Sequence, residues 1–221
     1  MSSHKVKSPI SYGDIVNCDL LNLHWICSFI DWKGLFSQKE LPPIVWTLHD
    51  MNPFLGLAHY KSDAQKLRNE LADGLSICAS TTDLDSKGWH EKKNILAKLR
   101  SDEICFVCPS QWLAAEVEKS FLKDFSVLVI PNGIDTKELK PITPDVAMRV
   151  LNIPQNNKKS ILFVADSLNS TRKGIDILVE ALKSLKFPDH YQLLIMGSDF
   201  CEPMIEIEMI NLGYISDDRL K

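Results

Sequence analysis

The strongest constraint on the fold is the regular alternation of short apolar runs with segments of helical periodicity. Most of the apolar runs are continuous, which is typical of strands buried on both faces of a parallel sheet. Parallel neighbours need a crossover between them, and the helical segments supply it. The sequence therefore predicts an α/β fold. The expected strands are CDLLNLHW (18–25), PPIVWTLH (42–49), EICFVCP (103–109), SVLVIP (126–131), SILFVAD (160–166), YQLLIMG (191–197) and IEIEMINLG (205–213).

Helical spacing of apolar side chains follows most of these runs. Ser110 is expected to cap the helix that follows it, because a serine hydroxyl can accept a bond from a free backbone N–H of the first turn. The expected helices cover residues 62–74, 90–100, 111–121 and 174–185.

A boundary is expected in IPNGIDTKELKPITPD (130–145), which is rich in proline and carries no periodic apolar pattern. We therefore predict a first α/β domain over 1–131, a hinge over 132–144 and a second α/β domain over 145–221. Both domains are expected to be incomplete, because the chain lacks an opening βα unit and ends just after a predicted helix start.

Composition excludes several classes of protein. The chain has 221 residues, is 45% hydrophobic and 24% charged, and carries a net charge of −4. These values are those of a folded globular protein, and they disfavour nucleic acid as a partner. The single C-x-x-C, at Cys105 and Cys108, has no second pair to complete a zinc site. We expect reduced core cysteines, no bound metal and a cytoplasmic location.

Two segments could carry chemistry at the carboxyl ends of strands, where open α/β sheets bind ligands. In TLHDM (47–51), His49 and Asp50 could orient a sugar hydroxyl or transfer a proton, or could be an ordinary cap and hydrogen-bonded histidine. His24 and His59 could line a pocket or belong to the core.

The second segment is STRKGIDIL (170–178), which opens a helix. Helix N-termini attract phosphate, Arg172 and Lys173 would add positive charge, and Gly174 would let the backbone approach. The alternative is a solvated basic turn. Gly197, in MGSD, is a weaker candidate of the same kind. Neither the dinucleotide fingerprint G-x-G-x-x-G nor the P-loop pattern is present.

A run of basic residues marks the helix predicted over 90–100. Lys92, Lys93, Lys98 and Arg100 could touch an anionic membrane surface at the inner face of the membrane, or could form a solvated face.

Taken together, the segments resemble the retaining family 4 glycosyltransferases, the group 1 superfamily, and most closely its bacterial members that build surface polysaccharide. The matching segments occur in the order found in that family. They are LHWI (23–26), PPIVWTLHDMNPF (42–54), VCPSQWLAAEVEKS (107–120), VIPNGIDTKELKP (129–141), FVADSLNSTRKGIDILVEAL (163–182), LLIMGS (193–198) and LGYISDDRL (212–220).

The resemblance implies two Rossmann-like domains of the glycosyltransferase B type, with no metal or resident cofactor. It implies transfer of a sugar, with retention, from a UDP- or GDP-sugar to a saccharide or lipid-linked acceptor in polysaccharide biosynthesis. His49 would lie beside the donor sugar and Lys173 would contact the donor diphosphate. Asn132 and Gly133 would form the hinge.

The family's glycine-rich loop and its Glu-x7-Glu segment have no counterpart in the sequence. We therefore expect the isolated chain not to turn over substrate. The alternatives are a binding or interaction module, or half of a split transferase whose partner chain supplies the missing C-terminal part.

Overall fold

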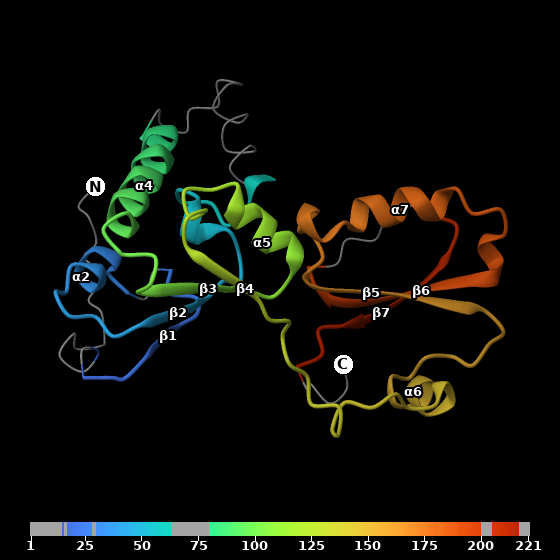
Figure 1. Ribbon diagram of the computed structural model, residues 1–221. Coiled ribbons are helices and arrows are strands. Elements are labelled where there is room, and N and C mark those ends of the chain that lie inside the picture. Colours follow the sequence, from blue (N-terminus) through green and yellow to red (C-terminus); the bar gives the residue numbers. More distant parts are fainter. Residues whose placement is uncertain (1–14, 16, 28–29, 63–79, 200–204, 217–221) are drawn as a thin grey trace. The chain divides into compact units, whose positions relative to one another are not determined.

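The chain forms two compact units, Met1–Gly133 and Ile134–Lys221, in a computed structural model that describes residues 15, 17–27, 30–62, 80–199 and 205–216. We call them the first and the second unit. Each has its own parallel β-sheet with helices between the strands (Figure 1). This arrangement confirms the predicted α/β fold with two Rossmann-like sheets.

The sheet of the first unit has four parallel strands, in the order β1-β2-β3-β4. Their bounds are β1 (Leu21–Leu23), β2 (Ile44–Thr47), β3 (Ile104–Cys108) and β4 (Ser126–Val129). The register sets Leu23 beside Trp46, and Trp46 beside Phe106. The carboxyl ends of β1 and β2 therefore lie next to each other.

Helices cover one face of this sheet, and α4 and α5 lie on the same side of it (Figure 1). Because strand order follows chain order, right-handed crossovers place successive helices on one face. The core beneath them is aromatic: Trp46 lies 5.9 Å from Phe36 and 5.8 Å from Phe106 between ring centroids, and all three are buried. The helical elements are α2 (Trp32–Phe36), η1 (Asn52–Phe54), α4 (Ser80–Leu96) and α5 (Gln111–Glu118).

The helices of the first unit differ in part from those predicted. The Ser110 hydroxyl accepts a bond from the Leu113 N–H at 3.2 Å, which confirms the predicted cap. Helix α4 begins at Ser80, ten residues before the predicted start, and ends at Leu96. The short α2 was not predicted, because five residues are too few for a periodic pattern. The helix predicted over 62–74 lies outside the described residues, apart from its first position.

The second unit has a parallel sheet in the order β5-β6-β7, with β6 in the centre. Buried Leu193 and Ile195 of β6 pack with Leu182 of α7. All seven predicted strands are thus present in the two sheets. The elements of this unit are α6 (Pro144–Val150), β5 (Lys159–Ser167), η2 (Thr171–Lys173), α7 (Ile175–Lys183), η3 (Pro188–His190), β6 (Tyr191–Ser198) and β7 (Glu208–Gly213).

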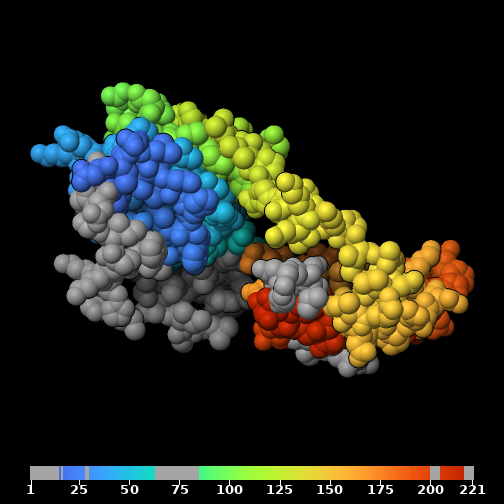
Figure 2. Space-filling model, turned by 90° about the horizontal axis from the view of Figure 1, so that it is seen from below, coloured from blue at the N-terminus to red at the C-terminus, as the bar shows by residue number. Residues whose placement is uncertain are grey.

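The segment from Ile134 to Val150 lies at the surface, where Figure 2 shows it in yellow. Helix α6 has no buried residue. Several large apolar side chains of the segment are exposed, including Ile134 at 67% and Ile142 at 60%. The segment therefore contributes little to the hydrophobic core. None of the described helices has the length and apolar character needed to cross a membrane.

Gly197, near the end of β6, lies directly against β5. A Cβ at this position would lie 2.0 Å from the Ala165 carbonyl oxygen, and the glycine φ is +152°. Both the contact and the dihedral exclude a side chain. The structure thus gives Gly197 a packing role between two strands.

We expect Gly197→Ala to destabilise the second unit by more than about 2 kcal/mol, because backbone rather than a flexible side chain must move. Hydrogen exchange read by mass spectrometry in β5 and β6 peptides would measure the change. Gly133→Ala is the matched control, since a Cβ there meets nothing within 4 Å. Unchanged exchange in the Gly197 variant would contradict the prediction.

Candidate functional site

Two histidines meet at the carboxyl ends of β1 and β2. His24 follows β1 and His49 lies two residues beyond the end of β2. His24 Nδ1 lies 2.9 Å from His49 Nε2, and the two exposed rings stack with centroids 5.2 Å apart. One nitrogen donates and the other accepts, so the two imidazoles are coupled through a shared hydrogen bond. Their outer edges remain available to a hydroxyl group.

The hollow behind this histidine pair is small. Its lining includes His24, His49, Trp32, Trp46 and Asn52, and its volume is about 10 Å³. That is space for about one water molecule. A ligand of the size of a sugar would therefore contact the exposed faces and edges of the rings, without entering the hollow.

Asp50 points inward and is buried. One of its carboxylate oxygens lies 2.5 Å from His59 Nδ1, and the other accepts the Asn52 N–H at 2.9 Å. A carboxyl group hydrogen-bonded to an imidazole fixes the orientation of the ring. In this geometry Asp50 positions His59 and begins the turn after β2. The sequence did not decide whether His59 lines a pocket or belongs to the core. In the structure it is half-exposed beside Asp50.

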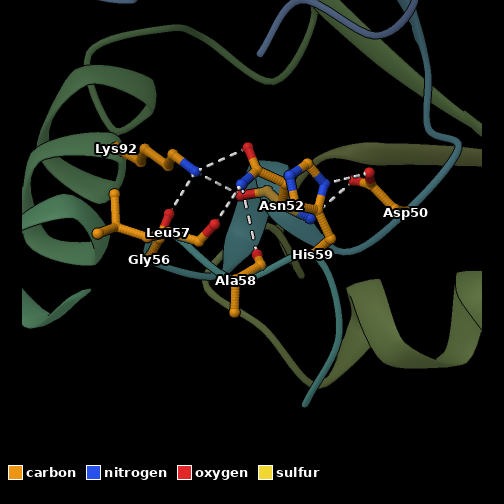
Figure 3. Close-up of polar contacts among 7 residues, drawn as sticks. All are labelled: Asp50, Asn52, Gly56, Leu57, Ala58, His59 and Lys92. Carbon is orange, nitrogen blue, oxygen red and sulfur yellow. Dashed lines mark hydrogen bonds and ion pairs between the residues drawn. The ribbon is translucent and has the colours of Figure 1, made fainter. Parts of the chain in front are cut away.

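Lys92 of α4 joins that helix to the loop after β2 (Figure 3). Its Nζ donates to the Asn52 carbonyl at 2.6 Å, to the Asn52 side-chain oxygen at 3.0 Å and to the Gly56 carbonyl at 2.6 Å. These three acceptors match the three donors of an ammonium group. The Asn52 side-chain amide in turn donates to the carbonyls of Leu57 and Ala58, at 3.2 and 3.3 Å. The loop is therefore held from within and from α4.

A second contact holds the same loop. The Asp85 carboxylate on α4 accepts the Leu57 N–H at 2.6 Å. A Cβ on Gly56 would lie 2.1 Å from the Asp85 carbonyl oxygen, so only glycine lets the loop approach the helix this closely. Burial lowers the pKa of Lys92 to about 8, while Cys27, Asp50 and Asp85 oppose that shift.

These contacts correct the prediction for Lys92 alone. Lys92 points to the loop and is half-buried, so it is not part of a solvated or membrane-facing surface, whereas Lys93, Lys98 and Arg100 are exposed. Lys93 lies over the Trp89 ring at 4.9 Å, and Arg100 pairs with Asp102. The sequence did contain a signal for this: Lys92 is four residues before the apolar Leu96, so the two share one helix face, and that face is buried at Leu96.

The second candidate site follows β5 in the second unit. Arg172 and Lys173 are exposed in the short 3₁₀ turn η2. Gly174 follows with a φ of +81°, and α7 begins at Ile175. The helix thus begins one residue after the predicted start at Gly174, and the left-handed glycine separates the basic pair from the helix. Gly174 is needed for its dihedral, since a Cβ there would meet only one side-chain atom, at 4.0 Å.

The charges around this turn both attract and repel an anion. Two cationic side chains precede α7, but its first turn carries Asp176. A negative residue there satisfies the positive end of the helix dipole and competes with a bound phosphate. The attraction for phosphate therefore comes mainly from Arg172 and Lys173.

The described residues include no group of three or more His, Cys, Asp or Glu side chains that could hold a metal ion. Burial raises the pKa of the Cys108 thiol to about 11, which makes it an unreactive core residue.

No family model matches the chain, and no curated protein matches its sequence. Among solved structures, sucrose-phosphate synthase from Thermosynechococcus elongatus is similar, with a TM-score of 0.57 and 18% sequence identity. The likeness covers 91% of this chain and 46% of that one, so the chain spans about half the length of its structural neighbour. The chain thus has a glycosyltransferase B-type fold.

The burial of Lys92 leads to a prediction on pH. Its pKa is about 8 in the folded chain and 10.5 when unperturbed, so the unfolded chain binds more protons between these values. The free energy of unfolding of the first unit should therefore rise through this window, by up to about 3 kcal/mol relative to a variant without the amine.

Urea denaturation of the wild type and of Lys92→Met at several pH values from 7 to 11 would measure this difference. Tryptophan fluorescence reports on the first unit, because all five tryptophans precede Gly133. Lys93→Met is the control for loss of a neighbouring exposed charge. Parallel pH profiles for wild type and Lys92→Met would contradict the prediction.

Proposed function

We propose that this chain is a glycosyltransferase, or part of one, that acts in the cytoplasm. It transfers a sugar with retention from a UDP- or GDP-sugar to a saccharide or lipid-linked acceptor in polysaccharide biosynthesis. The observation that carries the proposal is the pair of parallel α/β sheets in one chain, each with polar side chains after its strands. The neighbour of similar fold is a sucrose-phosphate synthase, itself a glycosyltransferase.

The donor diphosphate is assigned to the turn after β5. Arg172 and Lys173 are exposed there, and the turn sits at the carboxyl end of a parallel strand, where α/β sheets bind ligands. Charge-assisted bonds from a guanidinium and an ammonium suit the oxygens of a diphosphate. Neutralising the leaving diphosphate would assist cleavage of the glycosidic bond, because negative charge develops there in the transition state.

The sugar-facing group of the first unit is assigned to His49. Its Nε2 is engaged by His24, which fixes the ring and leaves Nδ1 at the opposite side for a hydroxyl. A histidine held in this way orients a substrate without having to be charged. Asp50 supports it from the interior through the turn after β2.

One observation favours the second candidate, half of a split transferase or an interaction module. Leu162 and Val164 of the edge strand β5 are both 54% exposed. Apolar side chains exposed side by side on a sheet suggest a surface that another segment covers. A chain of this kind would bind acceptor or partner without turning over a donor.

Titration calorimetry of the chain with UDP, GDP and their sugars tests the donor assignment. We expect binding of one nucleotide class, and at least a tenfold weaker affinity in Lys173→Ala, because one charge-assisted phosphate contact is lost. Lys186→Ala is the matched control, since it removes an exposed lysine elsewhere in the second unit and should change affinity less than twofold.

Equal loss in both variants would point to a general charge effect and would contradict a phosphate site at Lys173. A folded chain that binds no nucleotide would contradict the transferase proposal and leave the interaction module.

A further inference from the structure

An exposed tryptophan stands beside three histidines of the first unit, His24, His49 and His59. Trp25 follows His24 directly and is 59% exposed. Its ring centroid lies 6.0 Å from that of His59, with 40° between the planes. The stacked rings of His24 and His49 line the same small hollow as Trp25. Four aromatic rings, defined here as the aromatic platform, thus gather at the carboxyl ends of β1 and β2.

The base of the platform is fixed by buried groups. The indole N–H of Trp46, which is 1% exposed, donates to the His24 carbonyl at 2.9 Å. Buried Asp50 holds His59 at 2.5 Å. Rings that are held before a ligand arrives lose little conformational entropy on binding. The exposed Trp25 therefore lies beside a preorganised His59 ring and a fixed His24 backbone, a combination that is typical of binding sites.

We propose that the aromatic platform binds one pyranose ring of a saccharide acceptor, with Trp25 as its stacking surface. This inference rests on the proposed function and adds the residues that recognise the acceptor. A pyranose has an apolar face of C–H groups and an edge of hydroxyl groups. The negative face of an indole ring attracts polarised C–H groups. The nitrogens of the histidines can donate to or accept from the hydroxyls.

The angle between the rings favours a sugar over a nucleobase. A flat base stacks on one plane, and the 40° between Trp25 and His59 prevents it from lying against both. A puckered ring with hydroxyls at its edge can instead lay its C–H face on Trp25 and turn a hydroxyl toward His59. The coupled nitrogens of His24 and His49 offer a second polar edge.

Saturation-transfer difference NMR of the full chain with methyl glucoside, methyl mannoside, methyl galactoside and N-acetylglucosamine tests this site. We expect at least one pyranoside to receive saturation mainly on the protons of one ring face. Trp25→Ala should lower that signal at least fivefold, while Trp25→Phe, which keeps an aromatic face, should retain most of it. Trp112→Ala is the matched control, because Trp112 is 60% exposed on α5.

The outcomes separate this site from the donor site. Loss of sugar binding in Trp25→Ala, with the nucleotide affinity unchanged, supports the platform. Sugar binding that depends on Trp25 in a chain that binds no nucleotide keeps the platform and overturns the transferase proposal. Signals unaffected by Trp25→Ala, no binding of any pyranoside, or Trp25-dependent binding of uridine or guanosine instead would each overturn the platform.

Discussion

A single ammonium group, on Lys92, holds the segment that follows β2 to helix α4. Its three N–H groups donate hydrogen bonds to oxygens of Asn52 and Gly56. The fold of the loop follows from this: Asn52 is free to turn its amide to Leu57 and Ala58, and the chain returns so that His59 reaches Asp50. Three bonds to a charged donor offset only part of the cost of burying the charge, because burial still lowers the pKa of Lys92 to about 8.

Parallel pairing of β1 with β2 positions the two histidines, as Lys92 positions the loop. The register that sets Leu23 beside Trp46 also brings the ends of β1 and β2 together, and so places His24 beside His49. Neither histidine has a partner nearby in the sequence. Each is positioned by the same strand pairing that buries the aromatic core, so packing of the core and geometry of the site share one cause.

The sequence predicted the strands well because each strand leaves a short apolar run, even where the strand is partly exposed, as in β4, β5 and β7. It also located His49 and Asp50, since TLHDM follows such a run. The contacts that give these residues their roles were not visible, because they join positions far apart in the chain: His24 lies 25 residues from His49, and Lys92 lies 40 from Asn52. A lysine in a basic stretch is indistinguishable from a solvated one until the helix is placed.

The two candidate sites differ in what they require of a ligand. In the first unit, buried Asp50 fixes the His59 ring and buried Trp46 fixes the backbone of His24 before anything binds, so shape and stacking can select a ligand. In the second unit, Arg172 and Lys173 are exposed, and ordering such long side chains costs conformational entropy. Only a ligand with concentrated charge can offset that cost, and a diphosphate has it whereas a neutral sugar does not. The proposed division of labour, with sugar recognition in the first unit and phosphate binding in the second, therefore follows from how firmly each set of side chains is held.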